Sequence, residues 1–332
     1  MRVASLVLLA ALQASSQILV NAAGATFPYP IYAKWFDQFH LLRPDALINY
    51  QPVGSGAGVR QLLEGLVDFG ASDRPLTDAE LAGLSRPILH FPTVVGGVVP
   101  IYNLPRVQGE VKFTPEALAA IFGGKAIRWN DRLLTKANPG AALPDAPILT
   151  VHRADGSGTT YIFTEFLSKT VDDWRATVGA GTSVAWTAGV GAKGNAGVAA
   201  VVQGTAYAIG YVELIYALQN RIAYGPVRNS AGRFVRADTA TIRAAANALA
   251  GAVPEDFRVS ITNAPGRDSY PVASYTWLLA PARIADPAKR RVITEFLRWM
   301  LSQGQRTAEP LGYAPLPRPV LVRALRAVSG IN

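Results

Sequence analysis

The chain has 332 residues, of which 50% are hydrophobic and 17% are charged, a composition that excludes a disordered tail protein. This length predicts two domains, because single hydrophobic cores stop growing at roughly 250–300 residues. The net charge of +9 favours anionic ligands. Lysine and arginine are scattered along the chain, however, so we expect no nucleic-acid partner.

The N-terminus has the pattern of a cleaved signal peptide. Arg2 precedes an apolar run at residues 3–12 that is too short to span a bilayer. Ala14 and Ser16 stand at the −3 and −1 positions of a cleavage site, so residues 1–16 are predicted to be removed. A buried N-terminal strand or helix is the alternative. Because the sequence has no cysteine and no later long apolar segment, we expect an exported protein without a lipid anchor.

Beyond residue 16, β-rich apolar stretches alternate with helix-like stretches. Strands are predicted at QILVNAAG (17–24), ALINYQPV (46–53), PTVVGGVVPIYNL (92–104) and PILTVHR (147–153), and helices at 28–39, 55–66, 113–124 and 159–169. In the helix at 113–124, Thr114 is the expected N-cap and Pro115 the first helical residue. The alternation predicts an α/β fold with mostly parallel sheets flanked by helices.

Two segments are candidates for the connections between domains. Residues 92–99 contain two glycines within an apolar run, and residues 264–272 are rich in proline and glycine. If the chain crosses at both, residues 17–93 and 270–332 form one discontinuous domain, and residues 98–266 form the other. A ligand would then bind in the cleft between them, where hinge closure can bury it.

Three segments share one pattern: an apolar strand, a loop of small residues and the start of a helix. They are LVNAAGATFPYP (19–30), QPVGSGAGVRQL (51–62) and TVHRADGSGTTYIF (150–163). Helix starts have unsatisfied N–H groups and a positive dipole end, so they suit anions. Each loop alone is also explained by turn glycines and N-cap hydroxyls. Three such loops in one chain favour an anion site.

The second loop also resembles a dinucleotide-binding fingerprint, with Asp73 as the acidic ribose-binding residue. Two observations argue against that alternative. Val59 replaces the third glycine, and the loop follows an earlier strand–helix unit instead of opening the first one.

Arg153 and Asp73 are the candidate residues for recognising an anion. Arg153 ends a predicted buried strand, and its planar guanidinium suits tetrahedral oxyanions. Asp155 is placed to orient it, although an ordinary structural ion pair is the alternative. An ionised Asp73 can only accept hydrogen bonds, so it would select phosphate, which carries protons at neutral pH, over sulfate, which has none. An N-cap or turn aspartate before Pro75 is the alternative for Asp73.

The sequence resembles the periplasmic phosphate-binding proteins of ABC phosphate importers, which have the type II periplasmic binding protein fold. The resemblance rests on AGATFPYPIYAKWF, YQPVGSGAGVRQL, VDFGASDRPL, VHRADGSGTTYIFTEFLS and GAKGNAGVAAVVQGTAYAIGYVE, which follow the family's order over most of the chain. In that family, two α/β domains close on one phosphate without a metal or other cofactor.

The resemblance also implies a set of phosphate contacts. Thr26 and Phe27 would supply backbone N–H groups, with the Thr26 hydroxyl added, and Ser55 would cap the second helix and donate to phosphate. Asp73 would accept the phosphate proton, Arg153 would make the charged bond, and Asp155 would orient Arg153. The third helix start would contribute Ser157, Gly158 and Thr159.

This chain departs from the family pattern at four positions near the implied site: Ala23, Ala57, Ala196 and Arg74. The first three replace other residues without removing an implied contact, and only a peripheral contact at Ala196 is in doubt. Arg74 stands where a small or apolar residue is common. We expect it to strengthen the positive potential at the rim of the cleft and to speed phosphate capture.

The resemblance implies a monomeric periplasmic protein that captures inorganic phosphate and delivers it to an ABC permease in the inner membrane. A binder of another protonated tetrahedral oxyanion, such as arsenate, is one alternative. An exported phosphatase is another, but it would need an activated nucleophile or a metal pair. The sequence has only three histidines and no clustered metal-ligand spacing. We therefore expect a binding protein and no enzyme.

Overall fold

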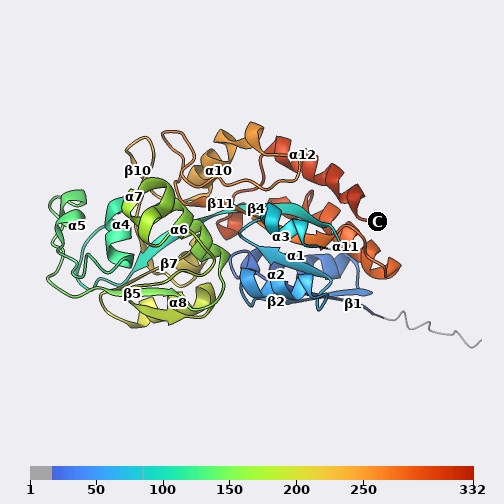
Figure 1. The fold of residues 1–332 in the computed structure, drawn as a ribbon, viewed down its shortest axis with the longest axis horizontal. Helices are drawn as coiled ribbons and strands as arrows, with labels where there is room; N and C mark the ends of the chain where they lie inside the picture. Colours follow the sequence, from blue (N-terminus) through green and yellow to red (C-terminus); the bar gives the residue numbers. More distant parts are fainter. Residues whose placement is uncertain (1–16, 85) are drawn as a thin grey trace, which may run out of the picture.

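The computed structural model describes residues 17–84 and 86–332 (Figure 1). The predicted signal peptide, residues 1–16, lies outside the described residues. Within the two described ranges, no helix combines the length and hydrophobicity that a membrane span requires.

One sheet runs through the described part of the molecule, in the order β2-β1-β3-β11-β4-β7-β5-β6, with β8 paired to β4. Its strands are β1 (Ile18–Gly24), β2 (Ala46–Gln51), β3 (Phe69–Ser72), β4 (Ile88–Tyr102), β5 (Leu149–Arg153), β6 (Val190–Ala192), β7 (Ala208–Glu213), β8 (Ala223–Tyr224) and β11 (Ala273–Pro281). A separate antiparallel pair consists of β9 (Val227–Arg228) and β10 (Phe234–Val235).

The long strand β4 divides the sheet into two parts. Its pairing with β11 ends at Gly97, opposite Ala273, and its pairing with β7 begins at Val98, opposite Glu213. We call β2, β1, β3, β11 and the start of β4 the first strand group. The end of β4, with β8, β7, β5 and β6, is the second strand group. The change of partner falls within the predicted connection at residues 92–99, while the domain boundaries themselves stay a prediction.

The strand directions refine the expectation of mostly parallel sheets. β1 is parallel to β2 and β3, and β5 is parallel to β6 and β7. In contrast, β4 and β11 are antiparallel to each other. Strand β11 is also antiparallel to β3, and β4 is antiparallel to β7. The parallel pairs are joined by helical crossovers, as parallel pairing requires. The antiparallel strands are the ones that lie at the junction of the two groups.

Helices cover both strand groups (Figure 1). Their bounds are α1 (Tyr29–Leu42), α2 (Ser55–Leu63), α3 (Asp78–Ala82), α4 (Pro115–Phe122), α5 (Arg132–Ala137), α6 (Gly158–Thr170), α7 (Asp172–Thr177), α8 (Gly194–Gly204), α9 (Leu214–Gln219), α10 (Thr239–Ala248), α11 (Pro287–Met300) and α12 (Arg318–Ala327). The predicted α/β fold is confirmed, and Thr114 caps α4 by accepting a hydrogen bond from the Ala117 N–H at 3.1 Å. Helix α11, near the C-terminus, packs against β1 and α1 of the first strand group.

An aromatic core beneath the second strand group positions the end of β5. The rings of Phe163 and Tyr211 stack with centroids 4.5 Å apart, and Phe122 packs edge-on against both. The Tyr211 hydroxyl accepts a hydrogen bond from the Arg153 N–H at 3.2 Å and shares another with the Thr160 hydroxyl at 2.7 Å. The aromatic core therefore fixes the end of β5 and the start of α6, which flank the third predicted loop.

Candidate functional site

The three predicted loops meet where the two strand groups adjoin. On the first group, the Gly54 N–H donates to the Gly24 carbonyl at 2.8 Å. Helix α2 packs so closely on the end of β1 that a Cβ at Gly58 would lie 2.2 Å from the Gly24 Cα. Only glycine permits this approach. The loops after β1 and β2 thus lie directly beside each other.

Contacts across the junction bring the third loop against these two. The Gly56 N–H donates to the Gly156 carbonyl at 2.9 Å. A Cβ at Gly158 would lie 2.5 Å from Ser55 Oγ and 2.6 Å from Asp73 Cβ. The start of α6 therefore lies in contact with the start of α2 and with Asp73, which follows β3.

Almost no solvent reaches the predicted site residues. Phe27, Ser157 and Thr159 have no exposed surface, and the most exposed of the polar members is Thr26, at 7%. A ligand held among these residues would be shielded from water, so each hydrogen bond to it would be stronger than at the surface. It could enter only when the loops of the two strand groups separate.

Arg153 is held in a fixed orientation by its neighbours. Its Nε donates to Asp155 Oδ1 at 2.8 Å, and its Nη2 donates to Asp155 Oδ2. The Nη1 atom donates to Thr159 Oγ1 at 3.3 Å, and the Gly194 N–H donates to Asp155 Oδ1 at 3.0 Å. Burial acts to raise the pKa of Asp155, but the hydrogen bonds and charge of Arg153 outweigh it, so the pKa lies below its ordinary value.

Asp73 is a buried carboxyl group with an altered pKa. Its Oδ1 accepts a hydrogen bond from the Thr276 hydroxyl at 2.8 Å, and its Oδ2 lies 3.4 Å from Ser55 Oγ. Burial raises the pKa of Asp73 to about 7, although the Thr276 bond and the charge of Arg153 act in the opposite direction. Near neutral pH, Asp73 can therefore either accept a hydrogen bond as a carboxylate or donate one as a carboxylic acid.

The expectation that Ser55 caps the second helix is wrong. The N-cap of α2 is Gly54, which has a φ of 96°, and no side chain caps this helix. Ser55 is the first helical residue, and its hydroxyl accepts a hydrogen bond from the Asp73 N–H at 3.3 Å. In contrast, Ser157 caps α6, because its Oγ accepts from the Thr160 N–H at 3.1 Å. The N-cap position is thus occupied by Gly54, whose positive φ differs from the extended conformation usual for a capping residue.

An ion pair argues against the expected role of Arg74. Its guanidinium makes two hydrogen bonds to the carboxylate of Glu80, at 2.6 and 2.9 Å, and lies 6.0 Å from the centre of the Tyr161 ring. The adjacent carboxylate largely cancels the field that the guanidinium would project to solvent. Arg74 therefore adds little positive potential at the rim of the cleft.

Sequence reasoning missed three residues that touch the predicted site. Asn195 is fully buried, and its Nδ2 donates to Thr26 Oγ1 at 2.8 Å and to Thr159 Oγ1 at 3.1 Å. The Tyr216 and Tyr313 hydroxyls donate to the carbonyls of Thr26 and Phe27, at 2.6 and 2.7 Å. Asn195, which follows Gly194 at a helix start, was a visible signal in the sequence. Neither Tyr216 nor Tyr313 had a signal in the sequence that pointed to the site.

The three histidines lie in structural environments. His90 is buried and accepts a hydrogen bond from the Leu76 N–H at 3.1 Å. His152 stacks on Trp186 with ring centroids 4.9 Å apart, as expected for a core or rim residue, and His40 bonds the backbone next to β2. Across residues 17–84 and 86–332, no three His, Asp or Glu side chains are grouped so that they could hold a metal ion.

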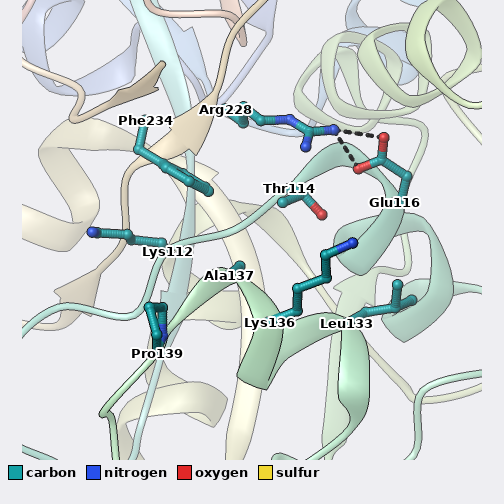
Figure 2. A pocket seen from close by; sticks show the side chains of 9 residues that line it. All are labelled: Lys112, Thr114, Glu116, Leu133, Lys136, Ala137, Pro139, Arg228 and Phe234. Carbon is teal, nitrogen blue, oxygen red and sulfur yellow. Dashed lines mark hydrogen bonds and ion pairs between the residues drawn. The ribbon is translucent and has the colours of Figure 1, made fainter. Parts of the chain in front are cut away.

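A separate surface hollow of about 560 Å³ lies on the second strand group, away from the predicted site residues (Figure 2). Arg228 donates to both carboxylate oxygens of Glu116 in its wall, and the Lys136 side chain extends toward Thr114 while the Lys112 side chain points away from this pair. Because Arg228 is already neutralised and the lysines are exposed, this hollow lacks the buried donors that surround Arg153.

Comparison with known proteins gives matches over nearly the whole chain. Residues 11–303 match the family model described as a PBP superfamily domain. The "Phosphate-binding protein PstS" of Xylella fastidiosa is 42% identical over 316 residues, covering 94% of this chain and 85% of that protein. The protein of the same name from Pasteurella multocida is 43% identical over 303 residues, covering 91% and 87%. A solved phosphate-binding protein from Stenotrophomonas maltophilia shares the fold, with a TM-score of 0.70, 19% identity and 93% coverage of both chains.

Proposed function

The chain belongs to the PstS family of phosphate-binding proteins, and from this premise we propose that the buried cluster around Arg153 binds one inorganic phosphate ion. In this proposal the ion is surrounded by the residues that sequence analysis named: Thr26, Phe27, Ser55, Asp73, Arg153, Ser157, Gly158 and Thr159. Asp155 orients Arg153 and does not touch the ion.

The observation that carries the proposal is the convergence of two helix starts and a buried guanidinium from different strand groups. The first residue of α2, Ser55, lies against Gly158, the first residue of α6, and Arg153 bonds Thr159 in the same turn. Asp155 largely balances the charge of Arg153, so net charge contributes little to the site. An anion would be held chiefly by N–H and O–H donors, as at other helix N-termini.

The two strand groups correspond to two domains in this proposal, with residues 17–93 and 270–332 in one and residues 98–266 in the other. The change of partner along β4 at Gly97 and Val98 supports a hinge at this place. Phosphate would bind when the domains are apart, and closure would bury it among the loops.

The protein serves as the substrate-binding component of a phosphate ABC transporter, in keeping with its relatives, which are named phosphate-binding proteins. We further propose that it works in the periplasm after removal of residues 1–16, as a monomer, and that it hands phosphate to a permease in the inner membrane.

Binding without catalysis is the simpler account of this site. The hydrogen bonds of His40, His90 and His152 involve neither the side chain of Asp73 nor the guanidinium of Arg153. Phosphate-ester hydrolysis needs a nucleophile activated by a base or a metal. Arsenate, which is tetrahedral and protonated like phosphate, remains the alternative ligand, because the same donors would satisfy it.

Calorimetric titration of phosphate-stripped protein tests the proposal. We expect one phosphate per chain and no measurable heat from sulfate at pH 8.5. Titration with arsenate decides between the two protonated ions. A protein that binds neither phosphate nor arsenate would refute the proposed function.

A further inference from the structure

Two tyrosine hydroxyls hold neighbouring carbonyls in the first loop. Tyr216 donates to the Thr26 carbonyl at 2.6 Å, and Tyr313 donates to the Phe27 carbonyl at 2.7 Å. Both hydroxyls are buried, and both bonds are short. The two tyrosines differ in where they come from.

Tyr216 reaches the loop from the second strand group, whereas Tyr313 reaches it from a segment bridged to the first strand group, where it also lies beside Glu213 of β7. Tyr216 lies in α9, directly after β7 of the second strand group. Tyr313 precedes Ala314, which bridges to Val95 in the first part of β4. A separation of the strand groups would break the Tyr216 bond and leave the Tyr313 bond intact.

Asn195 makes a second connection to the same residue. Its side-chain amide donates to the Thr26 hydroxyl at 2.8 Å, and its backbone N–H lies 3.3 Å from the same oxygen. Asn195 is anchored on the second strand group, because its Oδ1 accepts a hydrogen bond from the Glu213 N–H at 2.9 Å. The second strand group thus makes hydrogen bonds to both the hydroxyl and the carbonyl of Thr26.

We propose that Tyr216, together with Asn195, is a latch that holds the two strand groups together and slows the release of phosphate. This inference rests on the proposed function. Tyr216 is a positioning residue, because its hydroxyl bonds the protein backbone and need not touch the ion.

The latch acts on the closed arrangement alone. The buried site residues require the strand groups to separate before phosphate can leave, and separation returns the Tyr216 hydroxyl to water. Its hydrogen bond therefore stabilises the closed arrangement and does not stabilise the fold of either strand group. Burial raises the pKa of Tyr216, with the nearby Glu213 adding to the effect, so the hydroxyl remains protonated and able to donate.

The matched variants Tyr216→Phe and Tyr313→Phe test the latch. Each removes one hydroxyl from a carbonyl in the same loop and keeps the ring. Phosphate binding is measured by stopped-flow kinetics and calorimetry, and unfolding is measured with and without phosphate. Because the Thr26 carbonyl keeps a second donor, the Tyr29 N–H at 3.3 Å, the loss should stay near that of one hydrogen bond.

For Tyr216→Phe we expect the dissociation rate and the dissociation constant to rise about three- to tenfold, with the association rate within about twofold of wild type. Its melting temperature without phosphate should fall less than that of Tyr313→Phe, and the rise on adding phosphate should shrink. Tyr313→Phe should melt lower in both conditions and should keep the full rise with phosphate. An unchanged release rate in Tyr216→Phe, or equal losses of melting temperature in the two variants without phosphate, would overturn the latch.

Small-angle scattering in phosphate-free buffer separates failure of the latch from failure of the proposed function. A wild-type protein that binds no phosphate would refute the proposed phosphate binding but not the latch. A larger radius of gyration for Tyr216→Phe than for Tyr313→Phe then supports the latch without reference to phosphate. Equal radii in a protein that binds no phosphate would overturn the latch as well.

Discussion

Replacing Asp73 with asparagine should weaken the rejection of sulfate. In the proposed site an ionised Asp73 faces the ion and can only accept a hydrogen bond, so phosphate satisfies it with a proton and sulfate cannot. A buried polar group left without a partner costs about 1–3 kcal/mol. The amide of asparagine offers a donor in place of the carboxylate, so sulfate affinity should rise at least about tenfold in Asp73→Asn.

The pKa of Asp73 makes this prediction quantitative in wild-type protein. With a pKa of about 7, the carboxyl is protonated in only ~3% of molecules at pH 8.5 and in ~90% at pH 6. If sulfate requires the protonated form, its affinity should rise by about tenfold or more as the pH falls from 8.5 to 6. Phosphate carries a proton throughout this range and should change far less.

Calorimetric titrations of both ions at pH 6 and pH 8.5 provide the assay, with Asp73→Asn as the control that has no carboxyl to titrate. The variant should bind sulfate equally well at the two pH values. Two results would refute the reasoning. One is a sulfate-to-phosphate affinity ratio that is the same in Asp73→Asn and wild type at pH 8.5, and the other is a wild-type ratio that does not change with pH.

Three further substitutions probe the site and its rim. Arg153→Ala removes the buried guanidinium proposed to bond the ion, and truncating one partner of a buried charge pair costs about 2–5 kcal/mol of binding, so phosphate affinity should fall at least about 30-fold by calorimetry; a loss below tenfold would place the residue outside the site. Gly158→Ala adds a methyl group 2.5 Å from a hydroxyl oxygen of the opposite loop, so it should abolish phosphate binding without lowering the melting temperature of phosphate-free protein. Gly204→Ala, whose Cβ would meet no atom within 4 Å, is its control and should bind normally. Arg74→Ala should leave the association rate and its salt dependence unchanged in stopped-flow measurements, because Glu80 already pairs with the guanidinium; a slower, less salt-sensitive association would restore the capture role.

Local patterns in the sequence predicted the parts of the site that lie within single loops. The strand ends, the helix starts and the cap at Ser157 depend on backbone hydrogen bonds between residues close in sequence. Arg153 and Asp155 are two residues apart, so their pairing was accessible from the same stretch. The family resemblance then assigned these loops to one ligand.

Expectations failed where a role depended on the conformation around the residue. Ser55 has a residue type that favours capping, but Gly54, with a positive φ, occupies the N-cap position, and Ser55 is already the first helical residue. Arg74 has a charge that would attract anions, but Glu80, six residues further on in the first turn of α3, pairs with its guanidinium. Residue type alone did not determine either outcome.

The sequence by itself determined the α/β class, the three small-residue loops and the charged pair at the end of β5, because these follow from periodicity and from contacts between near neighbours. The tertiary structure alone decided how the loops meet. Asn195 and Tyr216 lie 169 and 190 residues beyond Thr26, and the Thr276 donor to Asp73 lies 203 residues away. Contacts over such separations depend on how the strand groups pack together, and no local pattern encodes that geometry.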